Sequence, residues 1–359
     1  MTNGISPFTR TPGIAGGALI ETHFSDEIIA NFESLESFKY VYKIVGLRGS
    51  GKSVEYSIVM NHFREEKNWL VFALSAGGNP LQTLISALSK EDFIDNKTRT
   101  ESYGANAAAR GNVGIASADA GFSATIDVSN NEHYYSDENE LRQMLKAAKN
   151  NGLKVLIGID DIAKTDAMVQ FLSILGMIMM EPDYDVRLIC TGLSKNIEDF
   201  VSIPHLSFFV RSESIKIKPL DKHEIAAKYR NLLEINREEA VELAKFTKGY
   251  AYGYQVLGEL CFNLQKSCID EEIEDSFDEA IGTQYDLLWT SLTESEQELI
   301  RIILSTDGTV SNIKERMEKN TSFASLRDRL IKKHMLISDS RGTVEIPLPR
   351  FKEYVDSWH

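Results

Sequence analysis

One octapeptide constrains this chain more than any other feature. Residues 46–53 read GLRGSGKS and match the pattern G-x-x-x-x-G-K-[ST] at every position. A β-branched and aromatic run, residues 40–45, precedes the octapeptide, and apolar residues at helical spacing follow it from Val54 to Phe63. These flanks predict a strand, a glycine-rich loop and a helix in succession, which is the setting in which the pattern marks a phosphate-binding loop.

The residue types of the octapeptide suit a bound polyphosphate. Its glycines allow dihedral angles that other residues resist, so the backbone can wrap closely around phosphate groups. Successive N–H groups then point inward, and the positive end of the following helix adds to the attraction for an anion. A glycine-rich turn that carries Lys-Ser by coincidence is the alternative. We expect a nucleotide to be held by Gly46, Gly49, Ser50, Gly51, Lys52, Ser53 and Val54.

Two side chains of the loop have separate tasks, and a second motif completes the site. Lys52 would reach the β- and γ-phosphates, and the Ser53 hydroxyl would ligate Mg²⁺. Residues 154–161, KVLIGIDD, form an apolar run that ends in two carboxylates. Asp160 would hold the Mg²⁺ directly or through water, and Asp161 would orient or activate the attacking water. We therefore expect Ser53 and Asp160 as metal ligands, with Lys52 and Asp161 as catalytic residues.

Strands alternate with helices from residue 39 to residue 220, which predicts a parallel α/β sheet. Thr191 lies near the end of a strand at residues 186–192, and it would lie near the γ-phosphate if that strand neighbours the one ending at Asp160. Residues 97–137 break the alternation. Small apolar and polar residues alternate there with period two, which favours an inserted hairpin, and a disordered Gly/Ala/Ser loop is the alternative.

The remaining regions differ from this core. Residues 1–38 form a Pro/Gly-rich arm followed by an amphipathic helix. Residues 221–287 have purely helical periodicity and predict a small helical bundle. Residues 288–359 predict three helices and a hairpin that turns on residues 340–342, which is the order of elements in a winged helix.

Composition and charge exclude some settings and single out one region. No run of about 18 apolar residues predicts a membrane span, no secretory signal is visible at the N-terminus, and three cysteines without metal-ligand spacing suggest a reducing compartment. We therefore expect a cytoplasmic protein. The formal net charge of −14 argues against an overall electrostatic attraction for nucleic acid. Residues 310–352, however, carry ten basic and five acidic residues and form a locally basic region.

The order of these parts resembles the AAA+ ATPases of the origin-recognition-complex-like and archaeal-ATPase-like group, close to the STAND signalling ATPases. The resemblance implies a P-loop ATPase core of the ASCE/AAA+ type, a helical lid at 221–287, a C-terminal winged helix, and ATP and Mg²⁺ as cofactors. It also implies a sensor-1 role for Thr191 and makes Arg211 the best candidate for an arginine finger, which would act on a neighbouring subunit and require self-association. A surface ion-pair partner is the alternative for Arg211. The residues that carry the resemblance are residues 46–53 (Walker A), residues 157–161 (Walker B), Lys216, Pro219, Leu220, residues 249–255 and residues 292–297.

Two departures from the family pattern point to a slow switch. The Walker B motif ends in Asp161 where a fast AAA+ motor usually has glutamate, and the shorter side chain would place water less well. The turn at residues 252–255 has no arginine at the usual sensor-2 place. Both departures predict a protein that holds nucleotide and hydrolyses it slowly.

The basic C-terminal region leaves the partner open. In a winged helix the third helix enters the major groove of DNA and the wing contacts the backbone. The residues that would meet double-stranded DNA are Ser325, Arg327, Arg329 and Lys332 on the third helix and Arg341 at the tip of the wing. The alternative is a solvated helix whose apolar face lies in a core, in a module that packs on protein.

Two function classes follow. The first is an ATP-switched DNA-binding protein. The second is a STAND-like regulatory ATPase whose winged helix contacts protein. A metabolic kinase is a weaker third interpretation, because no domain for an acceptor substrate is evident.

Overall fold

The chain folds around a five-stranded parallel sheet. The structure is a computed structural model that describes residues 4–94, 128–317, 322–338 and 342–359, with backbone only at 128–136. The strand order is β2-β3-β4-β1-β5, and every pairing is parallel. The strands are β1 (Val41–Val45), β2 (Trp69–Leu74), β3 (Lys154–Ile159), β4 (Val186–Gly192) and β5 (Glu213–Lys216). The predicted parallel α/β sheet is confirmed.

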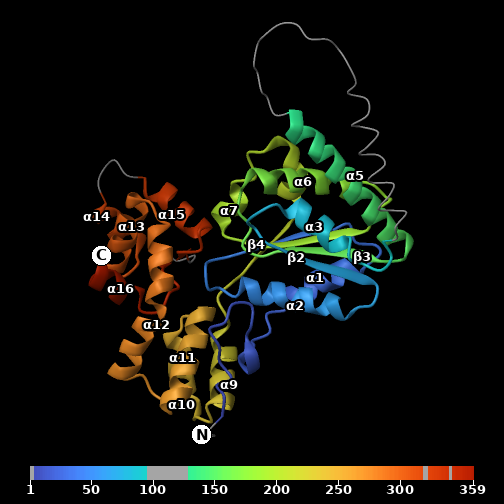
Figure 1. Ribbon diagram of the computed structural model, residues 1–359. Helices are drawn as coiled ribbons and strands as arrows, with labels where there is room; N and C mark the ends of the chain where they lie inside the picture. The colour runs from blue at the N-terminus through green and yellow to red at the C-terminus, as the bar shows by residue number, and fades with distance from the viewer. Residues whose placement is uncertain (1–3, 95–127, 318–321, 339–341) are drawn as a thin grey trace, which may run out of the picture.

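Helices cover both faces of this sheet, so the core has three layers (Figure 1). α1 (Phe24–Glu33) and α2 (Lys52–Glu65) pack against one face through Ile28, Phe32 and Val59, which are all fully buried. The other face is covered by α3 (Pro80–Leu88), α5 (Val128–Asn150) and α6 (Asp166–Met179). Because both faces of the sheet are covered, β1 and β4 are buried along their whole length.

The sheet brings the two motifs to one edge. Because all strands are parallel, the loops that follow β1, β3 and β4 leave from the same carboxyl edge. β4 lies between β3 and β1, with Ile159 opposite Cys190 and Ile44 opposite Thr191. The condition stated for Thr191, that its strand should neighbour the strand leading to Asp160, is therefore met.

Two short segments differ from the sequence prediction. α8 (Ser207–Arg211) is a short helix that leads into β5, and the sequence had not indicated it. The buried Lys43 side chain explains this helix, because its Nζ donates to the carbonyls of Phe209 and Val210 and so caps the C-terminal end. The short helix α7 (Ser194–Glu198) follows β4.

The inserted segment begins and ends differently from the prediction. α5 starts at Val128, so residues 128–137 belong to a helix and not to the insertion at 97–137. Their polar sequence lacks an apolar stripe, which is why we expected the helix to begin only at Glu138. Residues 95–127, which hold the expected hairpin or loop, lie outside the described part of the chain.

Four helices follow the sheet, and we call them the lid helices: α9 (Lys222–Leu232), α10 (Arg237–Phe246), α11 (Ala251–Leu264) and α12 (Glu271–Thr290). Asp221 caps α9 by accepting from the N–H groups of its first turn, and Asn236 and Glu239 form a capping box at α10. None of the helices in the described residues is long and apolar enough to span a bilayer.

The C-terminal segment has three helices followed by a two-stranded antiparallel sheet and a last helix. These elements are α13 (Glu294–Leu304), α14 (Val310–Arg316), α15 (Phe323–Lys332), β6 (Ile337–Ser338), β7 (Val344–Glu345) and α16 (Phe351–Trp358). The tip of the hairpin, residues 339–341, lies outside the described residues, and Arg341 with it.

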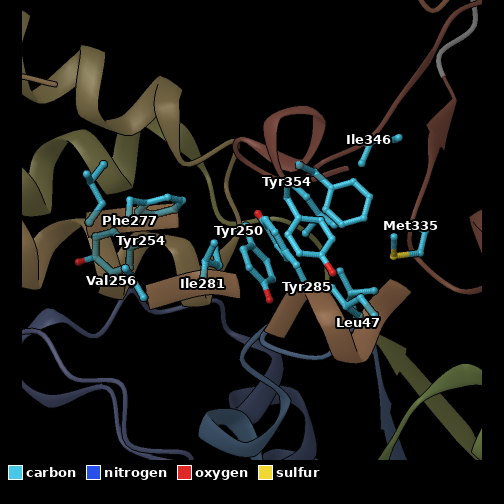
Figure 2. Close-up of a cluster of buried hydrophobic side chains, with 14 of the residues drawn as sticks. Leu47, Tyr250, Tyr254, Val256, Phe277, Ile281, Tyr285, Met335, Ile346 and Tyr354 are labelled. Carbon is cyan, nitrogen blue, oxygen red and sulfur yellow. The ribbon is translucent and has the colours of Figure 1, made fainter. Parts of the chain in front are cut away.

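The lid helices and the C-terminal segment share one hydrophobic core. Figure 2 shows Phe277 and Tyr254 of the lid helices, Tyr285 of α12, and Tyr354 and Ile346 of the C-terminal segment within this cluster. The long helix α12 belongs to both regions, as it contacts α11 and α16. One residue of the octapeptide, Leu47, also belongs to this cluster, and not to the two clusters that flank the sheet.

Candidate nucleotide-binding site

A cavity of about 340 Å³ opens at the carboxyl edge of the sheet. It is lined by residues 48–53 of the octapeptide, by Asp160, Asp161 and Thr191, and by residues of α11 and α12. The remaining wall comes from the N-terminal arm, residues 9–20. The volume of the cavity lies in the range of small-molecule and cofactor sites.

The octapeptide forms a loop that ends in a helix N-terminus. Gly51 has φ of 99° and is the N-cap of α2, where its carbonyl accepts from the N–H groups of Val54 and Glu55. Gly49 has φ of 76°, and a Cβ there would lie 2.2 Å from the hydroxyl oxygen of Tyr250. Both positions therefore require glycine, Gly49 for its conformation and for its contact with the lid helices.

Lys52 is a buried ammonium with a weak partner. It is 8% exposed, and its Nζ donates to the carbonyl of Leu47 at 2.9 Å. Burial lowers the pKa of Lys52 to about 8, although the nearby Asp161 and Asp160 act in the opposite direction. A carbonyl compensates only part of the free energy that is lost when the Lys52 ammonium is removed from water. A polyphosphate bound beside Lys52 would compensate more of it.

A hydrogen-bonded group joins the last residue of the octapeptide to the strands β3 and β4. Its members are Ser53, Asp160 and Thr191. The Ser53 hydroxyl donates to Asp160 Oδ1 at 3.1 Å, and the Thr191 hydroxyl donates to the same oxygen. Thr191 Oγ1 in turn accepts from the N–H of Asp161 at 2.8 Å. The structure thus brings together Lys52, Ser53, Asp160, Asp161 and Thr191, which come from three separate stretches of sequence.

Asp161 has an unusual backbone and a loose partner. Its φ of 55° is a left-handed conformation that few residues other than glycine adopt. Its Oδ2 lies 3.9 Å from a terminal nitrogen of Arg48, and about half of each side chain is exposed. The carboxylate therefore faces the cavity with a weak ion pair as its nearest charge contact.

Two buried polar atoms in the cavity wall have no hydrogen-bond partner. They are Ser50 Oγ and Gln284 Oε1, and both residues line the cavity. Buried polar atoms are rarely left unsatisfied in native proteins, so each points to a ligand group or water that would complete it. Together with the glycine loop and Lys52, they fit a nucleotide.

The residues present also fit Mg²⁺. Within the described residues, no group of three or more His, Cys, Asp or Glu side chains could hold a metal ion. Mg²⁺ usually takes one or two protein oxygens and completes its octahedron with phosphate oxygens and water. Ser53 and Asp160 supply two such oxygens beside the loop.

The lid helices contact the phosphate loop of this site, whereas no described residue of the C-terminal segment lines the cavity. The Tyr250 hydroxyl donates to the carbonyl of Arg48, and the Tyr252 N–H donates to the carbonyl of Gly49, each at 2.9 Å. His334, just after α15, has a buried Nε2 without a partner. Its pKa is lowered by burial and then by the charges of Lys216 and Lys52.

The N-terminal arm is the part of the cavity that sequence reasoning missed. The Phe8 ring packs against Tyr229 and Tyr254 in the lid core, and the Tyr254 hydroxyl donates to the carbonyl of Ala18 at 2.9 Å. At its other end, Thr22 and the N–H of Ser25 donate to Glu55, a buried carboxylate of α2. The arm spans the cavity from the lid helices to α2.

These anchors were invisible in the sequence. They join distant residues, such as Thr9 and Gln255, which are 246 positions apart, and Arg10 and Glu259, which are 249 positions apart. The Pro/Gly-rich composition of the arm indicated only that it is not a regular element.

Several predicted site residues lie elsewhere. Arg211 is exposed at the end of α8 and is not part of the cavity wall. On α15, Arg327 binds the neighbouring Asp328, Arg329 lies 3.7 Å from the buried Glu296, and Lys332 lies 3.9 Å from Glu198 of α7. Of the predicted DNA contacts, Ser325 is exposed without such an ion pair and Arg341 lies outside the described residues.

Comparisons with known proteins agree with this architecture. A family model described as a domain of unknown function (DUF8462) matches residues 283–355. No curated protein sequence matches the chain. Among solved structures, the Walker-type ATPase PABY2304 of Pyrococcus abyssi has a TM-score of 0.59 and 12% sequence identity, with 95% of this chain and 97% of that chain covered.

Two further structures are similar over most of their length. The ORC2 protein of Aeropyrum pernix has a TM-score of 0.49 and 14% identity, covering 99% of this chain and 95% of that chain. The ORC1 protein of the same organism, solved in complex with DNA, has a TM-score of 0.43 and 12% identity, covering 95% and 93%. At these identities the likeness concerns the fold, and it rests on the first structure. The chain has the fold of the AAA+ P-loop ATPases.

Proposed function

We propose that the protein is a Mg²⁺-dependent ATP switch that hydrolyses ATP slowly and couples its nucleotide state to the C-terminal segment. The observation that carries this proposal is the hydrogen-bonded group of Ser53, Asp160 and Thr191 beside the buried Lys52. A phosphate loop, a metal-binding pair and a polar residue on the neighbouring strand are the parts that phosphoryl transfer needs in a P-loop site.

Each residue has a separate task. The loop N–H groups and Lys52 bind the phosphates, and Ser53 with Asp160 would hold Mg²⁺, which supplies charge neutralisation at the β- and γ-phosphate oxygens. The Thr191 hydroxyl donates to the Asp160 carboxylate and accepts from the backbone N–H of Asp161. It therefore fixes the two aspartates relative to each other. Asp161 orients the attacking water and accepts its proton.

The nucleoside would extend from the loop toward the arm. The cavity continues from the octapeptide to residues 9–20 and to Gln255 and Gln284 of the lid helices. Its wall there holds both apolar side chains, such as Ile14, and the unpartnered Gln284 Oε1. A base and a sugar need this combination of apolar surface and a few polar groups.

Slow turnover follows from the position of Asp161. The shorter aspartate and its left-handed backbone both limit its readiness as a base. The lid helices offer backbone and tyrosine contacts to the loop, with no arginine in residues 252–255.

Nucleotide state can act on the C-terminal segment through the charge of Lys52 and through the helix that follows β4. In addition to burial, the charge of Lys52 lowers the pKa of His334. Lys332 of α15 forms an ion pair with Glu198 at the end of α7, the helix that follows β4. We infer that the C-terminal segment is a winged helix whose α15 is held on the core in this state.

The basic residues of α15 and residues 310–352 favour double-stranded DNA as the partner of the released helix. A second candidate is a regulatory ATPase whose winged helix contacts protein. The observation in its favour is that Arg327, Arg329 and Lys332 already have acidic partners inside the chain.

Fluorescence anisotropy separates the two candidates. DNA binding is measured with ATP, with ADP and without nucleotide, across a salt series, for the wild type and for Lys52→Ala. ATP-dependent binding that weakens steeply with salt and disappears in Lys52→Ala supports the DNA switch, because phosphate contacts release counterions. Tight ATP binding without DNA binding in any state would contradict it and favour a protein partner.

A further inference from the structure

Arg48 is the one charged side chain of the phosphate loop besides Lys52. It is the third residue of the octapeptide, lies in the wall of the cavity, and is 40% exposed. The backbone on which it stands is held on both sides, since Tyr250 donates to the Arg48 carbonyl and Tyr252 donates to the Gly49 carbonyl. The backbone is therefore fixed, while the guanidinium is free to change partners.

The present partner of Arg48 is easy to exchange. Its Nη2 lies 3.9 Å from Asp161 Oδ2, beyond hydrogen-bond distance, and the Asp161 side chain is 55% exposed. Arg48 and Lys52 both line the cavity, and the Arg48 charge also lowers the pKa of Lys52. A triphosphate placed at Lys52 would offer Arg48 a more negative and better-matched partner than Asp161.

Other arginines are less well placed for this task. Arg10 also lines the cavity, but it is bound to Glu259 of α11. Arg211 is outside the cavity wall, and the turn at residues 252–255 has none. Among the arginines of the cavity wall, Arg48 alone faces the carboxylate to which we assign the attacking water.

We propose that Arg48 is a catalytic residue that binds the γ-phosphate, so that the phosphate loop supplies its own arginine finger. This inference rests on the proposed ATPase function. Without a γ-phosphate the guanidinium neutralises Asp161. With ATP bound it moves to the γ-phosphate oxygens, and Asp161 is released to bind the attacking water.

The reaction that follows balances without another group. The water oxygen forms a bond to the γ-phosphorus while the bond from that phosphorus to the β,γ-bridging oxygen breaks. ADP leaves with the bridging oxygen and the electron pair of the broken bond, and Asp161 takes the proton of the water and passes it to solvent or phosphate. Arg48 stabilises the charge on the γ-phosphoryl oxygens as this bond breaks.

Two consequences distinguish this arrangement from a finger supplied by another subunit. First, ATP binds through a contact that ADP lacks, so loss of Arg48 weakens ATP selectively. Second, turnover per protein molecule does not depend on protein concentration, because no partner subunit completes the site.

The test uses the full chain and three substitutions. Arg48→Ala removes the guanidinium, Arg48→Lys keeps a single charge without the planar fork, and Arg64→Ala is the matched control, an exposed arginine at the far end of α2. Dissociation constants for ATP and for ADP are measured by competition with a fluorescent nucleotide in the presence of Mg²⁺. Single-turnover hydrolysis is measured over a hundredfold range of protein concentration, and thermal melting checks that each variant folds.

For Arg48→Ala we expect ATP affinity to fall about 10- to 100-fold, as for loss of a charge-assisted contact, with ADP affinity within about twofold. Hydrolysis should fall by about 10³-fold or more, as for removal of an arginine finger, and Arg48→Lys should recover part of it. Arg64→Ala should match the wild type, and the rate per molecule should stay constant on dilution.

Three results would overturn the inference while the ATPase proposal stands. These are equal losses of ATP and ADP affinity in Arg48→Ala, full activity in that variant, or a rate that falls on dilution and is abolished by Arg211→Ala. If instead the wild type binds no ATP and Lys52→Ala changes nothing, both proposals are wrong.

Discussion

Replacing Thr191 by valine tests the geometry of the site with one change of nearly equal size. Thr191 is fully buried and its hydroxyl has two partners, Asp160 Oδ1 as acceptor and the Asp161 N–H as donor. Valine fills the same space with a methyl group, so it removes both hydrogen bonds without a cavity. Any effect can therefore be assigned to the hydroxyl.

The size of the effect follows from these two contacts. A hydrogen bond to a charged group contributes about 1.5–3 kcal/mol, and leaving the Asp161 N–H without an acceptor costs about 1–3 kcal/mol. Since neighbouring effects are not additive and the edge of the site can admit water, we expect a total near 3 kcal/mol. This lowers the melting temperature by about 6–12 °C for a core of this size.

Activity should suffer separately from stability. Without Thr191 neither Asp160 nor Asp161 is fixed, so we expect the hydrolysis rate to fall about 10- to 100-fold, equivalent to about 1.4–2.7 kcal/mol. ATP affinity should change less than fivefold or so, because the loop and Lys52 are untouched. Differential scanning calorimetry and single-turnover hydrolysis measure the two effects.

Thr191→Ser is the control, since it keeps the hydroxyl and loses one methyl group, which costs about 1 kcal/mol. The reasoning is refuted if Thr191→Val melts and hydrolyses like the wild type, or if Thr191→Ser is equally impaired. A double-mutant cycle with Asp160→Asn should show coupling of about 1.5–3 kcal/mol.

Three more predictions follow from buried charges. Glu296→Ala should destabilise the C-terminal segment by about 3 kcal/mol because it leaves Lys333 without its carboxylate. Burial raises the pKa of Glu296, but the hydrogen bond from Lys333 and those from Thr293 outweigh it and bring the pKa below 4.5. The contribution of Glu296 to stability is therefore present at neutral pH and is lost as the pH falls below that value. Urea denaturation of the wild type and of Glu296→Ala at pH 7 and at pH 4 measures this loss. Glu55→Gln leaves one acceptor oxygen for two donors, Thr22 and the N–H of Ser25, so it should loosen the arm and speed ATP dissociation about tenfold in stopped-flow experiments. Unchanged dissociation would contradict the role of the arm. The pKa of Lys52, lowered by burial to about 8, predicts that ATP affinity falls as the pH rises above 8, since binding needs the ammonium; a profile that is flat to pH 10 would contradict this.

The sequence predicted the sheet and the phosphate end of the site because both depend on local pattern. The octapeptide can be recognised from adjacent residues alone, because it lies between a strand and a helix. The strand that leads to Asp160 and Asp161 can be predicted from its apolar run. Thr191 could be placed because parallel strands share one edge. Its hydrogen bonds could not be foreseen.

The rest of the site depends on contacts between distant segments. Nothing in residues 9–20 indicates that they cover a cavity, since their anchors are Gln255 and Glu259 on α11. The helix α8 was missed because Lys43, about 165 positions earlier, supplies its cap. The charges of α15 looked free in the sequence, but Glu296 and Glu198 pair with them in the fold.

Leu47 has a consequence for how this protein opens. It belongs to the phosphate loop by sequence, but its side chain is 7% exposed within the core of the lid helices and the C-terminal segment (Figure 2). The lid helices cannot swing away from the loop without exposing Leu47 to water or drawing the loop with them. Amide hydrogens of the loop should therefore exchange with solvent in the same cooperative unit as those of α11 and α12, and more slowly once ATP is bound. Nucleotide binding at the loop would then protect the amide hydrogens of α11 and α12 from exchange.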